Sequence, residues 1–196
     1  PFIWRTDWLE NLGITEIPET LEEVEEVFYR IAKEDPDGNG VDDTYGLALV
    51  RELWGAQYGL EGFFNAYHAY PNIWYEDEEG NLVYGTVQAE PMKAALADLQ
   101  KLYAAGAIDP EFIVKDSAKV GESVASLKSG AFYGMWWNMS SDLPVLHERS
   151  GEGAGSLVVP EPALQRRSAR HAAEHRRHPQ HFLCGEQELR APGKAV

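Results

Sequence analysis

The sequence contains a single cysteine, Cys184, and few basic residues. One cysteine excludes both a disulfide framework and a zinc site built from cysteines. Only 17 Lys and Arg stand against 32 Asp and Glu, which gives a formal net charge of −15. A chain this acidic repels phosphate backbones, so we expect no binding of nucleic acid. No run of residues approaches the ~20 apolar positions needed to cross a bilayer.

The chain nevertheless has the means to form a core. Its 196 residues are 44% hydrophobic and 11% aromatic, which excludes a wholly disordered protein. It begins at Pro1 with neither an initiator Met nor a basic-then-apolar signal segment. We therefore expect a portion of a longer protein, with any targeting signal lying outside it.

Composition changes sharply near residue 156. Residues 1–155 contain 10 Lys and Arg against 28 Asp and Glu, whereas residues 156–196 contain 7 against 4. The second segment has no helical or strand period of apolar residues. Three interpretations are open: a basic arm that binds something anionic, a natural disordered tail, or out-of-frame translation of GC-rich DNA. We expect one ordered domain over 1–155 and an atypical basic tail over 156–196.

Helices and strands are predicted to mix along the first segment, which indicates the α/β class. Thr20 followed by Glu23 forms a capping-box pattern ahead of apolar residues at three-to-four spacing. Pro91 is expected as the first residue of a later helix, whose buried stripe is Met92, Ala95, Leu96, Leu99, Leu102 and Tyr103. The predicted helices cover residues 8–12, 21–34, 91–105 and 117–128, and the predicted strands cover 44–50, 72–75, 82–87 and 131–137.

The strongest local signal is an acidic loop over residues 35–43. Its oxygen-bearing side chains fall at positions 1, 3, 5 and 9, with Gly40 at position 6, as in the calcium loop of an EF-hand. Alternate residues of a tight loop point inward, so their oxygens converge on one point and suit a hard cation. The predicted ligands of a structural calcium ion are Asp35, Asp37, Asn39, Asp43 and the backbone carbonyl of Val41.

Position 12 of this loop departs from the pattern. An EF-hand has a bidentate Glu there, and this chain has Gly46. A strand rather than a second helix is expected to follow, so a calcium-sensing helix pair is excluded. The alternative to a metal site is a surface turn rich in Asp, Asn and Gly that binds no ion.

Exposed aromatic side chains are candidates for stacking on sugar rings, although most aromatics of a domain belong to its core. The exception is the pair Trp136 and Trp137, placed at the end of a predicted strand and followed by Asn138. Neighbouring residues of a strand point to opposite faces, so both rings are buried only where both faces are covered. We expect Trp136, Trp137 and also Trp74 to line a ligand cleft, with Asn138 as a polar partner.

Several segments together resemble the extracellular solute-binding proteins of family 1, which are lipoprotein components of ABC sugar importers. The resemblance extends over about residues 2–155. It rests on the segments Trp4–Gly13, Pro18–Glu23, Asp35–Gly40, Leu102–Phe112 and Leu127–Gly134.

The resemblance implies a two-lobed α/β fold of the periplasmic-binding-protein type II class, of which this chain holds mainly one lobe. It implies capture of an oligosaccharide rather than catalysis, docking on the membrane permease subunits, a structural calcium in the acidic loop and an extracytoplasmic, lipid-anchored location. Two rival functions remain: a calcium-stabilised carbohydrate hydrolase, which needs two carboxyls facing each other across a cleft, and a calcium-dependent interaction module with an exposed apolar patch beside the loop.

Overall fold

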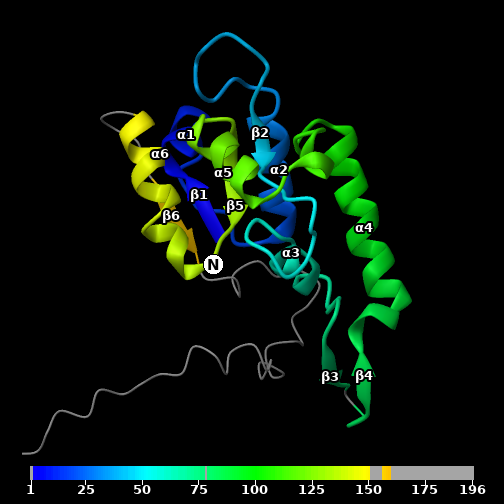
Figure 1. Cartoon of the computed structure of the whole chain (residues 1–196). Helices are drawn as coiled ribbons and strands as arrows, with labels where there is room; N and C mark the ends of the chain where they lie inside the picture. The colour runs from blue at the N-terminus through cyan, green and yellow to red at the C-terminus, as the bar shows by residue number, and fades with distance from the viewer. Residues whose placement is uncertain (1, 78, 151–155, 160–196) are drawn as a thin grey trace, which may run out of the picture.

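The structure is a computed structural model that describes residues 2–77, 79–150 and 156–159. Four strands form the main sheet in the order β2-β5-β1-β6, and two form a separate hairpin (Figure 1). The strands are β1 (Phe2–Arg5), β2 (Tyr45–Leu47), β3 (Trp74–Glu76), β4 (Leu82–Tyr84), β5 (Ser129–Tyr133) and β6 (Ser156–Val159). The helices are α1 (Thr6–Asn11), α2 (Leu21–Ile31), α3 (Glu61–Asn65), α4 (Ala89–Ala104), α5 (Ser117–Ala125) and α6 (Asp142–Ser150), with 3-10 helices η1 (Gly85–Val87), η2 (Phe112–Val114) and η3 (Trp136–Met139).

The main sheet is mixed, as the predicted α/β class requires. Strand β5 pairs parallel with β2 and antiparallel with β1, and β1 pairs antiparallel with β6. Successive side chains of β1 enter opposite cores. Phe2 packs on the α2 side with Phe28, and Ile3 packs on the α5 and α6 side with Val120 and Leu146. The sheet is thus covered by helices on both faces, which accounts for the complete burial of β1 and β5.

Two strands of this sheet were not predicted. Residues 2–5 carry no turn or period that marks them as a strand, and their partners lie more than 120 residues away. Strand β6 falls at the start of the expected tail, so residues 156–159 pair in the sheet. The division at residue 155 stays a prediction, and residues 160–196 lie outside the described part of the chain.

Local signals placed most helices correctly. In α2, the backbone N–H of Glu23 donates to Thr20 Oγ1 at 3.3 Å, and the Glu23 carboxylate accepts from the Thr20 N–H at 3.1 Å. The predicted capping box is therefore confirmed. Helix α1 begins at Thr6, earlier than predicted, and Asp7 in its first turn pairs with Arg5. Helix α2 ends at Ile31, earlier than expected.

The apolar stripe predicted for α4 is only partly buried. Ala95 and Leu102 are fully buried, but Leu96 and Tyr103 are more than 40% exposed. Together with Phe112 and Ile113 they line an apolar hollow of about 420 Å³ between α4 and η2. Periodicity identified the apolar face of the helix correctly, but that face is wider than the neighbouring elements cover. Among the described residues, no helix combines the length and apolar character that a membrane span requires.

Candidate functional site

The first three predicted metal ligands converge in the acidic loop. Asp35 accepts from the backbone N–H of Asn39 at 3.1 Å and from that of Gly40 at 2.9 Å. The amide of Asn39 donates to Asp37 Oδ2 at 2.8 Å. Asp35, Gly38 and Gly40 all have positive φ angles, which give the chain its tight curvature here. Loop positions 1, 3 and 5 are therefore neighbours, with Asp35 and Asp37 both accepting from N–H groups of Asn39.

The remaining two candidate ligands flank the same point. Asn39 Nδ2 also lies 3.3 Å from Asp43 Oδ1, so its amide bridges two carboxylates. The carbonyl of Val41 accepts from the Asp43 N–H at 3.0 Å. The donor set is entirely oxygen, as Ca²⁺ prefers, and hydrogen bonds within the loop occupy those oxygens in this conformation.

The surroundings in the loop shift the pKa values of its carboxyl groups in different directions. Burial and contact with Asp35 raise the pKa of Asp37, while hydrogen bonds from Gly40 and then Asp37 lower the pKa of Asp35. The Lys128 side chain, followed by Asn39, lowers the pKa of Asp43. Burial thus disfavours the charged form of Asp37 more than that of Asp35, and a bound cation would favour the charged form of both.

The described residues hold no group of three or more His, Cys, Asp or Glu side chains arranged to bind a metal. Of the five predicted ligands, only Asp35, Asp37 and Asp43 belong to these residue types, and their carboxylates lie around the Asn39 amide. The calcium site therefore stays a prediction.

Both tryptophans of the predicted pair are exposed, but not because they end a strand. Strand β5 ends at Tyr133, and Trp136 and Trp137 lie on the 3-10 helix η3. The predicted strand over 131–137 is therefore too long. The exposed fractions are 68% for Trp136 and 41% for Trp137, and the two rings meet edge to face with centroids 5.6 Å apart and planes at 82°. The pair presents two perpendicular aromatic surfaces to solvent.

Asn138 lies differently from the expectation. It is completely buried, its Oδ1 accepts from the Met135 N–H at 2.5 Å and its Nδ2 donates to Asp142. The side chain caps the start of η3 and is not exposed to solvent. An amide at this point of the helix satisfies backbone groups that η3 cannot satisfy itself.

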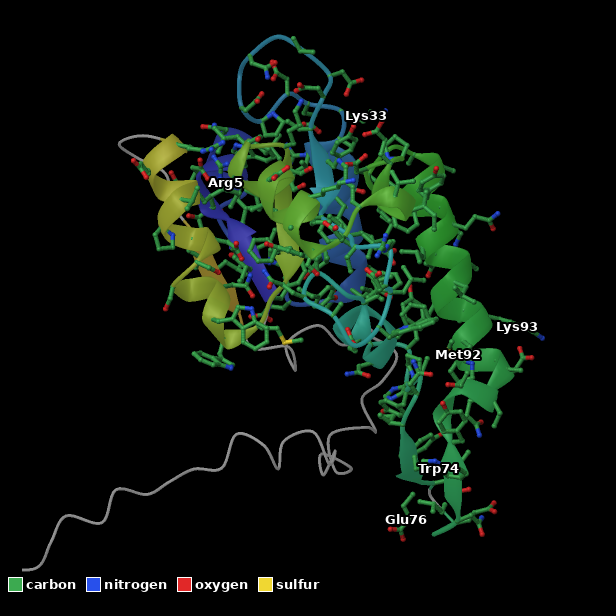
Figure 2. The ribbon with its side chains drawn as sticks, in the orientation of Figure 1. Arg5, Lys33, Trp74, Glu76, Met92 and Lys93 are labelled. Carbon is green, nitrogen blue, oxygen red and sulfur yellow. The ribbon has the colours of Figure 1, made fainter. Side chains whose placement is uncertain are left out.

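Trp74 lies apart from the tryptophan pair. It is 58% exposed on β3, opposite Tyr84 on β4, with ring centroids 5.2 Å apart. The β3–β4 hairpin extends away from the main sheet, and Trp74 sits on it far from α6 (Figures 1 and 2). The structure brings Trp136 and Trp137 together and does not bring Trp74 to them.

Two residues that the sequence gave no reason to select lie behind the pair. Gln57 accepts from Trp137 Nε1 at 2.9 Å and donates to Asp142 Oδ2 at 2.8 Å. These contacts join residues 80 and 85 positions apart, and no spacing rule links them. A Gln in a loop and an Asp at a helix start are ordinary in sequence, so only the fold identifies them.

Comparison with known proteins gives clear relatives, although no family model matches the chain. Over 128 residues the chain is 38% identical to lipoprotein LipO of Bacillus subtilis (strain 168), covering 65% of this chain and 25% of that one. Over 130 residues it is 31% identical to the polygalacturonan/rhamnogalacturonan-binding protein YtcQ of the same organism, covering 66% and 25%. The matched part spans about a quarter of the length of each of these curated relatives.

Solved structures agree in fold. The S. pneumoniae ABC-transporter substrate-binding protein FusA, in complex with kestose, aligns with a TM-score of 0.65 at 22% identity over 85% of this chain and 31% of that one. An extracellular solute-binding protein from Bifidobacterium longum subsp. infantis aligns with a TM-score of 0.65 at 22% identity over 82% and 33%. The resemblance to extracellular solute-binding proteins of family 1 is confirmed. An EF-hand mutant of FusA also aligns, with a TM-score of 0.66 at 21% identity over 85% and 31%.

The fold prediction is confirmed with it. The chain has part of the two-lobed fold of type II periplasmic binding proteins, mainly one lobe, with helices on both faces of a mixed sheet. The named neighbours are substrate-binding proteins of transporters rather than enzymes, and one curated relative is a lipoprotein.

Proposed function

We propose that this chain belongs to the substrate-binding component of an ABC importer and captures an oligosaccharide outside the cell membrane. The observation that carries the proposal is the exposed pair Trp136 and Trp137, on a 3-10 helix directly after the central strand β5 of a solute-binding fold. Exposed tryptophans on this short helix offer flat apolar surfaces, which suit the C–H faces of sugar rings.

Capture in this proposal is a closure between lobes. A lobe carrying the tryptophan pair moves toward a second lobe, so that the sugar is enclosed and leaves bulk water. The closed form then docks on the permease subunits in the membrane. The protein lies outside the cytoplasm and is held at the membrane by a lipid anchor, which fits the lipoprotein relative.

The acidic loop has a structural role in the same proposal. Asp35, Asp37, Asn39, Asp43 and the Val41 carbonyl hold one calcium ion that fixes the connection between α2 and β2. The all-oxygen donor set and the raised pKa of Asp37 support this role, as does the EF-hand of a structural neighbour. The ion contributes to folding and not to any bond-breaking step.

The hydrolase alternative finds no support at the tryptophan pair. Asp142 is the carboxylate linked to the pair, and it accepts hydrogen bonds from both Gln57 and Asn138. A general acid or nucleophile needs a carboxyl that faces the substrate. The geometry at η3 therefore favours a binding role over a catalytic one.

The test is calorimetric titration of the full-length protein with two panels of oligosaccharides. One panel is neutral, beginning with kestose, and the other is anionic, beginning with short galacturonate oligomers. We expect saturable binding to at least one panel, a change in indole fluorescence and recovery of the sugar intact. Absence of binding to both panels contradicts the capture function, and cleaved sugar supports the hydrolase alternative instead.

A further inference from the structure

A continuous chain of hydrogen bonds leads from the exposed Trp137 into the protein. Its indole N–H donates to Gln57 Oε1 at 2.9 Å, and Gln57 Nε2 donates to Asp142 Oδ2 at 2.8 Å. The same Asp142 oxygen accepts from the amide of the buried Asn138. One carboxylate therefore anchors both the residue that holds the indole and the residue that closes η3.

The direction of this chain follows from donor and acceptor chemistry. An ionised carboxylate can only accept, so Asp142 draws the NH₂ group of the Gln57 amide toward itself. The carbonyl of the same amide must then point the opposite way, toward Trp137. An indole N–H can only donate, so the orientation set by Asp142 is the one that Trp137 requires.

The surroundings make this arrangement rigid. Asn138 is fully buried, and Asp142 is the first residue of α6. Tyr58, the neighbour of Gln57, is also fully buried, and its ring packs on Phe132 of β5 with centroids 5.2 Å apart. Gln57, in the loop before α3, is thus bonded to the start of α6, and its carbonyl oxygen restricts the orientation of the Trp137 indole.

We propose that Gln57 is a positioning residue of the carbohydrate site. It fixes the plane of the Trp137 indole before the ligand arrives, which reduces the side-chain entropy lost on binding. Because the indole N–H is already hydrogen-bonded to Gln57, Trp137 recognises its ligand through the ring face alone. The site therefore selects the apolar C–H face of a sugar ring at Trp137, and not a hydroxyl group that accepts from the indole. This inference rests on the proposed carbohydrate function.

The first measurement needs no ligand. These 196 residues contain six Trp, so they contribute six indole N–H signals to the spectrum of the ¹⁵N-labelled full-length protein. The signal that disappears in Trp137→Phe is that of Trp137. We expect the indole N–H of Trp137 to exchange with solvent more slowly than that of Trp136. Equal exchange at both rings overturns the proposal without any change at Gln57.

The second measurement removes the acceptor. Gln57→Met keeps the length of the side chain and loses its amide. We expect it to shift the Trp137 signal and to speed the exchange of the indole N–H. The matched control is Gln100→Met at an exposed position of α4, which should leave all indole signals unchanged.

Oligosaccharide binding by the Gln57→Met variant tests the positioning role itself. We expect Gln57→Met to weaken oligosaccharide binding about five- to tenfold with an unchanged melting midpoint, as loss of one orienting hydrogen bond implies. Parent-like affinity of Gln57→Met overturns the positioning role while the carbohydrate function stands. If the parent itself binds no oligosaccharide, the carbohydrate function fails, and the positioning role fails with it.

Discussion

The backbone of Gly46 packs directly against that of Phe28. A β-carbon on Gly46 would lie 2.5 Å from the α-carbon of Phe28 and 2.8 Å from its carbonyl oxygen. This contact brings β2 against α2 in the main core. It also explains why the acidic loop lacks the Glu of an EF-hand at position 12, because no side chain fits there.

The first prediction concerns this contact. Gly46→Ala forces α2 and β2 apart, and we expect it to lower the free energy of unfolding by about 2–3 kcal/mol, the upper range for overpacking a core. Urea unfolding followed by circular dichroism measures the change. Gly13→Ala is the control, because Gly13 has open space around it and a positive φ. It should cost about 1–2 kcal/mol. A smaller loss for Gly46→Ala than for Gly13→Ala contradicts the packing argument.

The second prediction concerns calcium. An ion that binds only the folded state raises stability by mass action, by about 2.7 kcal/mol at a concentration one hundred times the dissociation constant. We expect millimolar calcium to raise the melting midpoint of the parent over that in chelator, and Asp37→Asn to abolish the difference. Asp77→Asn is the matched control, since Asp77 organises another acidic turn, accepting from the N–H groups of Glu79 and Asn81. Equal midpoints for the parent in calcium and chelator contradict the site.

The third prediction concerns the tryptophan pair. Desolvated aromatic anchors carry much of the energy of a binding site, so Trp136→Ala and Trp137→Ala should each weaken oligosaccharide binding by roughly 2–4 kcal/mol. Calorimetry on the full-length protein measures the loss. Trp74→Ala tests the separate expectation from the sequence that Trp74, which lies apart from the pair on the β3–β4 hairpin, also contacts the ligand. If both η3 variants fold and bind as tightly as the parent, the pair does not line the site.

The fourth prediction concerns alkaline pH. Burial, followed by the charge of Asp142, raises the pKa of Tyr58 above its usual 10. In the unfolded chain Tyr58 ionises near pH 10, whereas in the folded chain it stays protonated. Its contribution to stability is therefore full below pH 10 and is lost as pH rises above that value. We expect Tyr58→Phe to lose less stability than the parent between about pH 9 and pH 11.5.

Urea unfolding at a series of pH values checks this expectation. The matched control is Tyr103→Phe, a change at a side chain that is 44% exposed. Its alkaline loss of stability should follow that of the parent. A Tyr58→Phe curve that coincides with the parent curve is incompatible with a buried, protonated Tyr58.

Features specified by a few adjacent residues were predictable. The reciprocal bonds of Thr20 and Glu23 form within one turn, so the capping box was visible in the sequence. The left-handed backbone at Gly13 follows from the same local logic. The convergence of Asp35, Asp37 and Asn39 likewise depends only on alternation within a short loop.

Features set by distant partners were not predictable. Strand β5 ends at Tyr133, which pairs with Phe2 at the start of β1, and the next residue, Gly134, lies against Ile3, where a β-carbon would be 2.7 Å from Ile3 Cδ1. No sequence signal near residue 134 indicates the contact with Ile3, so the apolar run to Trp137 resembles one long strand. Gln57 was missed for the same reason, because its two partners come from η3 and α6.

The order β2-β5-β1-β6 has a consequence for synthesis on the ribosome. Among the described strands β1 leaves the ribosome before the others, yet its partners β5 and β6 are the last two of them. At 5–20 residues per second, roughly 8–30 s separate the emergence of Phe2 from that of Ser156. During that interval the apolar segment Phe2–Trp4 has no strand on its β6 side and is a template for intermolecular pairing. A chain cut before residue 156 keeps that edge open permanently, so such truncations should be prone to aggregation.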